Sequence, residues 1–302
     1  MKFNQPLLTI AIPTYNRAGY LDLNLKQLLH NYNQLENPEQ LQIIVSDNAS
    51  NDSTQKIINN YKQIGLPILS LKNSKNIGFD GNFDSCLSNA KGKYFWIFGD
   101  DELLFNDSLK KIVGILNQND VGCIYLSGIG YDKSFDLSKY DQIPNEKIEV
   151  ITSHEYIKKI NYYITFCTGN IFNRNYLSDN FDFKKYIGSN LNQVHWYLNV
   201  LNNHNKHIVL KEKYFFIKSN NTGGYKLFQT FSTNFNKILK ENLDKKEVRF
   251  INNKLITEFF PIFLSNSANF KNEKVYWELF KNYYWYRLFW TKIVKAKIRE
   301  KS

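Results

Sequence analysis

The chain has 302 residues and 43% hydrophobic residues, so it can bury a sizeable core without disulfides or structural metals. An aromatic content of 16% excludes a disordered or low-complexity protein. Cys86, Cys123 and Cys167 are odd in number and widely spaced, which excludes a disulfide framework and favours reduced thiols in a cytoplasmic protein.

The net charge of +11 predicts an anionic partner, for which nucleic acid, phosphate-bearing small molecules and anionic lipid surfaces all qualify. Nucleic acid is the least favoured, because the chain has no helix-turn-helix, zinc or ribonucleoprotein pattern. The first apolar run, residues 7–12, is too short for a secretory signal. No run reaches the roughly 18 apolar residues of a spanning helix, so we expect no membrane crossing.

Strand and helix patterns alternate through the first 130 residues. Short apolar runs that end in turn residues predict strands at residues 7–12, 41–46, 67–72, 94–98 and 121–128. Leucine or isoleucine at helical spacing predicts helices at residues 20–32, 54–64, 79–92 and 108–118. Gly92 is expected to cap the third helix. This βαβα order predicts an α/β fold with a mostly parallel sheet and helices on both faces.

The pattern changes in the second half. We expect a long loop at residues 131–147, a strand pair at 162–174 and a helix at 190–201. A turn-rich segment at 219–225 is either a lid over the active site or an ordinary loop. From residue 227 the pattern is helical. We therefore divide the chain into a catalytic domain and a helical extension, with these bounds: 1–226, comprising a nucleotide-binding half 1–130 and an acceptor half 131–226, and 227–302.

Polar residues follow three of the predicted strands directly. They lie at residues 13–16, 47–48 and 99–102, and in open α/β sheets ligands bind at the carboxyl ends of the strands. The last group contains the carboxylates Asp100, Asp101 and Glu102. Such a cluster is a divalent-metal site, an acid/base pair or a solvated turn. Mg²⁺ and Mn²⁺ are often held by one or two carboxylates, with substrate phosphates completing the shell.

Three blocks of the chain, residues 7–21, 43–54 and 73–104, resemble the nucleotide-binding half of the family 2 glycosyltransferases. The resemblance covers roughly residues 7–130 and is closest to the abequosyltransferase-like subset that builds bacterial surface polysaccharides. It implies a GT-A fold and transfer of a sugar from a nucleoside diphosphate to a saccharide acceptor. That acceptor is expected to be lipid-linked, in lipopolysaccharide, O-antigen or capsule biosynthesis.

The resemblance also implies site residues. Those matching the nucleotide-contacting positions are Pro13, Thr14, Tyr15, Asp47, Asn76, Gly78 and Asp100. Asp101 matches the metal-binding position of the family's D-x-D element, with Asp100 supporting it, although Gly99 stands where a strict D-x-D has its first Asp. The expected metal is Mn²⁺ or Mg²⁺, which stabilises the departing diphosphate.

The catalytic base is harder to assign. Many inverting members carry an acidic pair on a helix of the second half, where this chain has Asn192 and Gln193. His195 is the only titratable residue of that helix, and it is either the base or a histidine packed between aromatic residues. Asp182 and Asp179 are the alternatives. The stereochemical outcome, inversion or retention, stays open.

Residues 169–174 are expected to form the floor of the acceptor pocket. Asn170 lies in this segment, and Arg174 is either a phosphate or saccharide contact or a surface arginine. Two other functions stay open beside glycosyl transfer. One is a nucleotidyltransferase acting on sugar phosphates, and the other is a noncatalytic relative that only binds saccharide or nucleotide.

The carboxyl-terminal segment is rich in aromatic and basic residues. Five of its aromatic residues cannot all face one core: Trp277, Tyr284, Trp285, Phe289 and Trp290. The basic residues follow them: Lys292, Lys295, Lys297, Arg299 and Lys301. This composition favours a peripheral contact with an anionic membrane, on the inner face of the inner membrane. The alternative is a helix packed on the catalytic domain or on the second subunit of a homodimer.

Overall fold

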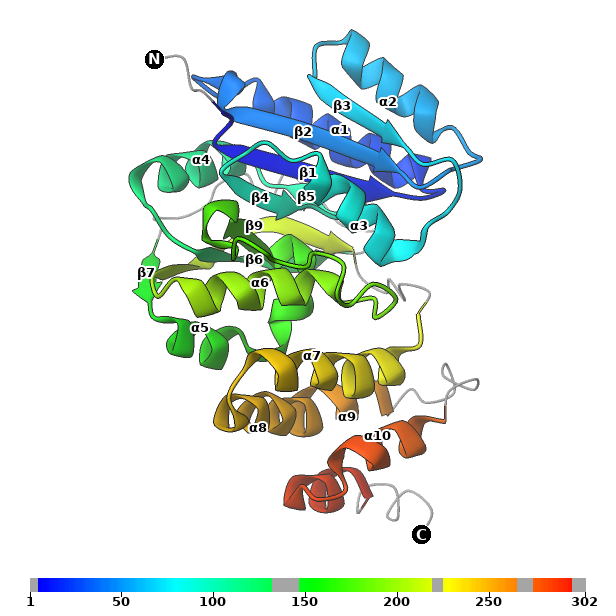
Figure 1. The fold of residues 1–302 in the computed structure, drawn as a ribbon. Coiled ribbons are helices and arrows are strands. Elements are labelled where there is room, and N and C mark those ends of the chain that lie inside the picture. The colour runs from blue at the N-terminus through cyan, green and yellow to red at the C-terminus, as the bar shows by residue number, and fades with distance from the viewer. Residues whose placement is uncertain (1–4, 132–146, 219–224, 265–273, 295–302) are drawn as a thin grey trace.

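The computed structural model describes residues 5–131, 147–218, 225–264 and 274–294. Within these residues nine strands form one sheet, and helices cover both of its faces (Figure 1). The long loop expected at 131–147 and the lid expected at 219–225 fall almost entirely outside the described residues.

The first half of the sheet is parallel, as the βαβα pattern predicts. Strands β3, β2, β1 and β4 are neighbours in that order. In chain order the elements are β1 (Leu8–Thr14), α1 (Ala18–Tyr32), β2 (Leu41–Asp47), α2 (Thr54–Gln63), β3 (Ile68–Lys72), α3 (Gly78–Ser88), β4 (Tyr94–Ile97), β5 (Leu103–Leu104) and α4 (Ser108–Gln118). β1, β2 and β4 are buried on both faces, which explains their continuous apolar runs.

The second half makes the sheet mixed. β8 (Asn170–Asn173) is antiparallel to both β4 and β6 (Cys123–Tyr131), and β9 (His207–Lys218) is parallel to β6. β5 and β7 (Ile148–Ile151) pair antiparallel with β9. The expectation of a strand pair at 162–174 is wrong, because two 3₁₀ turns, Asn161–Thr165 and Cys167–Gly169, precede the single strand β8.

The third helix ends earlier than expected. α3 stops at Ser88 with Asn89 as its C-cap, so Gly92 does not cap it. A glycine is needed at position 92 because the backbone there lies very close to Thr9 of β1. The backbone N–H of Gly92 donates to Thr9 Oγ1 at 2.8 Å, and a Cβ at this position would lie 2.5 Å from the Thr9 backbone nitrogen.

The helices that follow are α5 (Ser153–Ile160), α6 (Asn192–Asn203), α7 (Phe235–Asn242), α8 (Lys245–Lys254), α9 (Phe260–Leu264), α10 (Val275–Tyr283) and a final π-helical turn (Phe289–Val294). They lie on the side of the sheet opposite α1, α2 and α4, with α5 and α6 next to the sheet and the later helices beyond them (Figure 1). Leu255, Leu279 and Phe289 belong to the same hydrophobic cluster as Phe95 and Ile97 of β4. The extension therefore shares a continuous core with the sheet.

The aromatic residues of the extension divide between inside and outside. Phe289 is buried, whereas Trp277, Tyr284, Trp285 and Trp290 are exposed. Among the described residues, no helix combines the length and the apolarity needed to cross a bilayer.

Candidate active site

The carboxyl ends of β1, β2 and β4 meet at one edge of the sheet. Thr14, the last residue of β1, is in register with Asp47, the last residue of β2. The Thr14 hydroxyl also donates to Asp100 Oδ2 at 2.7 Å, across the turn that follows β4. The three polar segments expected at the strand ends are therefore adjacent, as the strand-end rule predicts.

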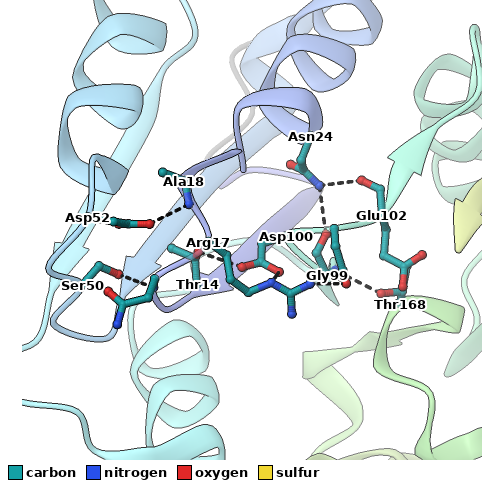
Figure 2. A network of polar contacts seen from close by, with 12 residues as sticks. Thr14, Arg17, Ala18, Asn24, Ser50, Asp52, Gly99, Asp100, Glu102 and Thr168 are labelled. Atoms are coloured by element: carbon teal, nitrogen blue, oxygen red, sulfur yellow. Dashed lines mark hydrogen bonds and ion pairs between the residues drawn. The ribbon is translucent and has the colours of Figure 1, made fainter. Parts of the chain in front are cut away.

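The turn at residues 99–102, here called the acidic turn, is fixed by side chains from distant segments. Asn24 of α1 donates from Nδ2 to the carbonyl oxygens of Gly99 (2.9 Å) and Glu102 (2.8 Å). The Gly99 N–H donates to Thr168 Oγ1 at 3.0 Å, and Figure 2 shows Asn24 and Thr168 on opposite sides of the turn. A Cβ on Gly99 would lie 2.8 Å from Glu102 Cγ, so the turn leaves no room for a side chain there.

Arg17 supplies the positive charge at the acidic turn. Its Nε lies 3.3 Å from Asp100 Oδ1, and its Nη2 is hydrogen bonded to Asp101 Oδ2. The guanidinium carbon lies 4.9 Å from the centroid of the Tyr20 ring. The Arg17 side chain keeps 30% of its surface exposed, whereas both carboxylates are nearly buried. The cation therefore reaches the carboxylates from the solvent side.

Neighbouring loops hold Arg17 in this position. Asn16 has a positive φ of 53°, and its N–H donates to Ser50 Oγ at 2.8 Å. The Ala18 N–H donates to Asp52 Oδ2 at 3.0 Å (Figure 2). The residues on both sides of Arg17 are thus attached to the loop after β2, which directs its side chain towards the β4 end.

Burial dominates the electrostatics of the turn. It raises the pKa of Asp100 to about 7, against the opposing effect of Arg17 and with a further increase from Asp101. Burial also raises the pKa of Glu102 well above its ordinary value, and Glu102 Oε2 has no hydrogen-bond partner in the described part of the chain. Burial lowers the pKa of Arg17, but the two aspartates more than offset this and raise it overall.

The residues at the turn fit a hard divalent cation that shares its shell with phosphate oxygens. Asp100 and Asp101 offer carboxylate oxygens, and one or two carboxylates are enough for Mg²⁺ or Mn²⁺ in such sites. Among the described residues, no three His, Cys, Asp or Glu side chains converge on a closed metal cage. A metal at this turn would have to displace Arg17, which contacts the same carboxylates.

Three of the expected nucleotide-contacting residues, Asp47, Asn76 and Gly78, take part in hydrogen bonds of the loops after β2 and before α3. Asp47 is fully buried and accepts from the Ser50 N–H (2.8 Å) and Gln55 Nε2 (2.5 Å). Asn48 Nδ2 donates to Asn76 Oδ1 at 2.9 Å and to the Gly78 carbonyl oxygen at 3.2 Å. The loops after β2 and before α3 are therefore joined through Asn48.

Two residues of the turn after β1 have different environments. Pro13 is partly buried within β1, whereas Tyr15 is 40% exposed beside the loops joined by Asn48. An exposed aromatic ring at a strand end can stack on a nucleotide base.

Of the two expected acceptor residues, Arg174 lies away from the acidic turn and that expectation is corrected, whereas Asn170 lies two residues after Thr168, near the turn, and its role stays a prediction. Arg174 is at the amino end of β4, because β8 is antiparallel to β4, and its Nη1 donates to the Gly92 carbonyl oxygen at 3.0 Å. Asn170 is buried, accepts from the Tyr156 hydroxyl at 3.1 Å and donates to the Phe166 carbonyl oxygen at 2.7 Å. Its amide is thus engaged in the core.

Of the expected base residues, His195 lies on the side of α6 that faces α7, and Asp179 and Asp182 precede this helix in the chain. His195 Nδ1 is 3.0 Å from Asn242 Oδ1, and its ring packs against Phe181 (4.5 Å between centroids) and Tyr186 (4.9 Å). Burial lowers the pKa of His195, which keeps the imidazole neutral at pH 7. Asp182 is exposed and accepts from the Lys184 N–H at 3.0 Å.

Asp179, the third candidate base, is also exposed. Within the described residues, none of the three candidates, His195, Asp182 and Asp179, contacts the acidic turn. The role of catalytic base therefore stays a prediction.

Three residues of the site were not among the expected ones: Arg17, Thr168 and Asp80. Arg17 carried a signal, because it lies three residues after the end of β1 and hence at the edge where the carboxylates were expected. Thr168 and Asp80 carried none. Asp80 Oδ2 accepts from the N–H groups of Gly188 (2.7 Å) and Asn190 (2.9 Å), more than 100 residues away, and so holds the start of α6 against α3.

The GT-A glycosyltransferases have this arrangement. Their parallel βαβ half is followed by antiparallel strands, and a turn with carboxylates lies beside the loops that contact the nucleotide. The sequence profile described as "Glycosyl transferase family 2" matches residues 9–181, more than half of the chain, and the chain belongs to this family.

Two relatives show where the similarity lies. Abequosyltransferase RfbV of Salmonella typhimurium is 44% identical over 108 residues, which are 34% of this chain and 30% of that protein. The "GalNAc(5)-diNAcBac-PP-undecaprenol beta-1,3-glucosyltransferase" of Campylobacter jejuni is 27% identical over 150 residues, 45% of this chain and 47% of that protein. The similarity therefore spans less than half the length of either relative.

Solved structures have the same fold. S. aureus TarS 1–349 in complex with UDP gives a TM-score of 0.61 at 17% identity, covering 89% of this chain and 76% of that one. The mannosyltransferase PcManGT from Pyrobaculum calidifontis, in complex with GDP-Man and Mn²⁺, gives 0.56 at 16% identity, covering 88% and 76%.

Proposed function

We propose that this protein is a metal-dependent glycosyltransferase that moves a hexosyl or deoxyhexosyl group from a nucleoside diphosphate to a saccharide acceptor. The acceptor is lipid-linked, and the product enters bacterial lipopolysaccharide, O-antigen or capsule. One observation carries this proposal: the buried carboxylates of the acidic turn lie beside the expected nucleotide-contacting loops and share one partly exposed cation, Arg17.

The acidic turn would hold the diphosphate end of the donor. Asp101 would be the principal ligand for Mn²⁺ or Mg²⁺, and Asp100, oriented by the Thr14 hydroxyl, would support it. The metal, when bound, stabilises the negative charge that develops on the departing diphosphate. Arg17 leaves the carboxylates and donates to phosphate oxygens, for which a guanidinium has well-matched geometry.

The loops joined through Asn48 would hold the nucleoside. Tyr15 stacks on the base, and Asp47 accepts a hydrogen bond from the base when Gln55 gives way. Asn76 and Gly78 lie along the nucleotide. Solved structures of the same fold support this role, because they contain UDP, UDP-GlcNAc or GDP-Man.

For the acceptor hydroxyl, His195 is the first base to test and Asp182 the second. With Nδ1–H donated to Asn242, the Nε2 atom of a neutral His195 is free to accept a proton. Because His195 is buried and hydrogen bonded to Asn242, His195→Gln lowers the melting temperature in either case. If His195 is the base, the variant also has a lower kcat and loses the acidic limb of the pH–rate profile. If the residue only packs, the profile keeps its shape.

The site of action follows from the acceptor. The name of the Campylobacter relative specifies a saccharide linked to undecaprenol as its acceptor, which supports a lipid-linked acceptor for this protein. We propose that residues 1–226 carry out the transfer and that residues 227–302 keep the protein at the inner face of the inner membrane. A homodimer is compatible with this arrangement and stays a prediction.

The test is thermal stability with UDP, GDP, CDP and dTDP, each with and without Mn²⁺. Wild type is compared with Asp101→Ala and with Glu36→Ala, a control on an exposed carboxylate outside the site. We expect one nucleotide to raise the melting temperature only with Mn²⁺, in wild type and Glu36→Ala but not in Asp101→Ala. If no nucleotide changes it under any condition, the protein is a noncatalytic or differently liganded relative.

A further inference from the structure

A basic groove lies between the α7–α8 region and the last described segment of the chain. It has a volume of about 930 Å³ and is lined by eleven side chains, none of which is acidic. Four of the lining residues are exposed cations: Lys240, Lys245, Arg249 and Arg287. We call this feature the basic groove.

The acidic side chains of α7, α8 and the turn between them have partners other than the groove cations. Glu241 forms an ion pair with Lys185 at 3.1 Å, and Glu247 is hydrogen bonded to His154 Nδ1 at 3.0 Å. Asp244 caps the start of α8, where it accepts from two backbone N–H groups. In the part of the chain that the structure describes, none of the four groove cations has an ion-pair partner. The basic groove therefore presents net positive charge to an anionic ligand.

An exposed group of aromatic side chains lies beside the groove. These residues, here called the aromatic face, are 40–57% exposed: Trp277, Phe280, Tyr284, Trp285 and Trp290. Their rings are in mutual contact, with centroid distances of 6.1 Å for Trp277–Phe280, 5.4 Å for Phe280–Tyr284 and 4.6 Å for Tyr284–Trp285. The aromatic face is thus one continuous apolar surface, of the kind that marks an interaction site.

The groove and the aromatic face meet at Trp285. This residue lines the groove, belongs to the aromatic face and has Lys240 Nζ 5.5 Å from its ring centroid. The orientation of α10 is fixed, because Val275, Leu279 and Tyr283 on its other side are buried in the core. The aromatic face therefore points away from the core, and no described part of the chain covers it. In Figure 1 these segments form the end of the molecule remote from β3 and α2.

We propose that the basic groove and the aromatic face together form a docking surface for an anionic phospholipid bilayer. The four cations bind lipid phosphates, while the tryptophan and tyrosine rings enter the interfacial region, where such amphipathic rings are stable. Single-stranded nucleic acid fits less well, because it needs free ring faces on which to stack bases. Here Phe280 is stacked with Trp277 and Tyr284, at interplanar angles of 17° and 27°.

The test measures binding to vesicles and needs no enzyme activity, so its failure is distinguishable from failure of the proposed reaction. Full-length protein is sedimented with vesicles of phosphatidylcholine alone, or of equal parts phosphatidylcholine and phosphatidylglycerol. The groove variant is Lys240→Gln/Arg249→Gln/Arg287→Gln. The matched control is Lys26→Gln/Lys56→Gln/Lys62→Gln, which removes the same charge from exposed positions on α1 and α2. Circular dichroism checks that each variant folds.

We expect wild type and the control to bind the anionic vesicles, with an affinity that falls as salt rises. The groove variant should bind roughly a hundredfold more weakly, since each of the three removed basic residues contributes about fivefold near such a surface. Trp277→Ser/Trp290→Ser should weaken binding while leaving the salt dependence in place. Equal weakening of the groove and control variants would overturn the proposal. So would stabilisation by inorganic phosphate without vesicle binding, which would identify a site for soluble anions.

Discussion

Arg17 Nε lies 3.3 Å from Asp100 Oδ1, so a residue of the turn after β1 neutralises a carboxylate of the turn after β4. Two adjacent, nearly buried aspartates repel one another and are costly to keep ionised. A guanidinium that approaches from solvent lowers that cost in the empty protein and can move when a stronger cation arrives. Arg17 thus acts as an internal counter-ion to the acidic turn.

Removing this counter-ion should destabilise the empty protein. Arg17→Ala leaves Asp100 and Asp101 without their partner, and we expect a loss of about 2 kcal/mol in the free energy of unfolding at pH 8. Mn²⁺ should restore most of the loss, because it can occupy the vacated position. Arg17→Lys keeps the charge but cannot contact both carboxylates in the same way. Its free energy of unfolding should lie between those of wild type and Arg17→Ala. Urea denaturation with and without Mn²⁺ measures this. A wild-type stability for Arg17→Ala would contradict the counter-ion role.

Asp101 should matter for catalysis far more than for folding. In Asp101→Asn the shape is kept and Asp100 still pairs with Arg17, so we expect a change in the free energy of unfolding below about 1 kcal/mol. The turnover number should fall at least ~100-fold, because the variant lacks the carboxylate expected to bind the metal that stabilises the charge on the leaving group. Sugar transfer is measured with the nucleotide that stabilises wild type. Unchanged turnover would remove Asp101 from the metal site.

Asp80 should be a positioning residue for the second half of the site. It accepts three backbone N–H groups around the start of α6, and burial raises its pKa against the effect of these bonds. Asp80→Asn should cost about 2 kcal/mol of folding free energy, because an amide cannot accept all three bonds. Asp84→Asn is the matched control one turn further along α3. It breaks only a 3.5 Å pair with the exposed Lys184 and should cost under ~1 kcal/mol. Equal costs in urea denaturation would contradict this assignment.

His207 should make the protein acid-sensitive. It is fully buried, its Nδ1 accepts from the Cys123 N–H at 3.0 Å, and Nε2 lies 2.9 Å from both Ser153 Oγ and the His204 carbonyl oxygen. Burial lowers the pKa of His207 to about 4. The unfolded chain therefore binds a proton first, and the stabilisation present above pH ~6.5 is lost as the pH falls towards 4, by about 3 kcal/mol in total.

The contribution of His207 is measured as a difference between proteins. Asp100 acts in the opposite sense over the same interval, since its raised pKa means that stability is lost as the pH rises from about 4 to 7. Urea denaturation of wild type and His207→Gln is therefore compared across this interval. The free energy of wild type should fall more steeply on acidification than that of the variant. Parallel curves would show that His207 takes up its proton equally in both states.

The βαβ half of this protein and the location of its polar strand ends could be predicted from local patterns in the sequence. Apolar runs of strand length and leucines at helical spacing are local signals, and residues after parallel strands must share one edge of the sheet. Asp100, Asp101 and Thr14 were therefore placed correctly relative to one another.

Tertiary structure alone decided the rest, because strand direction and side-chain partners depend on contacts between distant residues. Arg174 was expected at the acceptor pocket, but antiparallel pairing of β8 with β4 moves it to the opposite edge of the sheet. His195 was placed on the right helix, yet the packing of α7 determines that its imidazole meets Asn242. The ion pairs of Arg17 with Asp100 and Asp101 join residues 83 and 84 positions apart in the chain, and no local periodicity encodes a contact of that length.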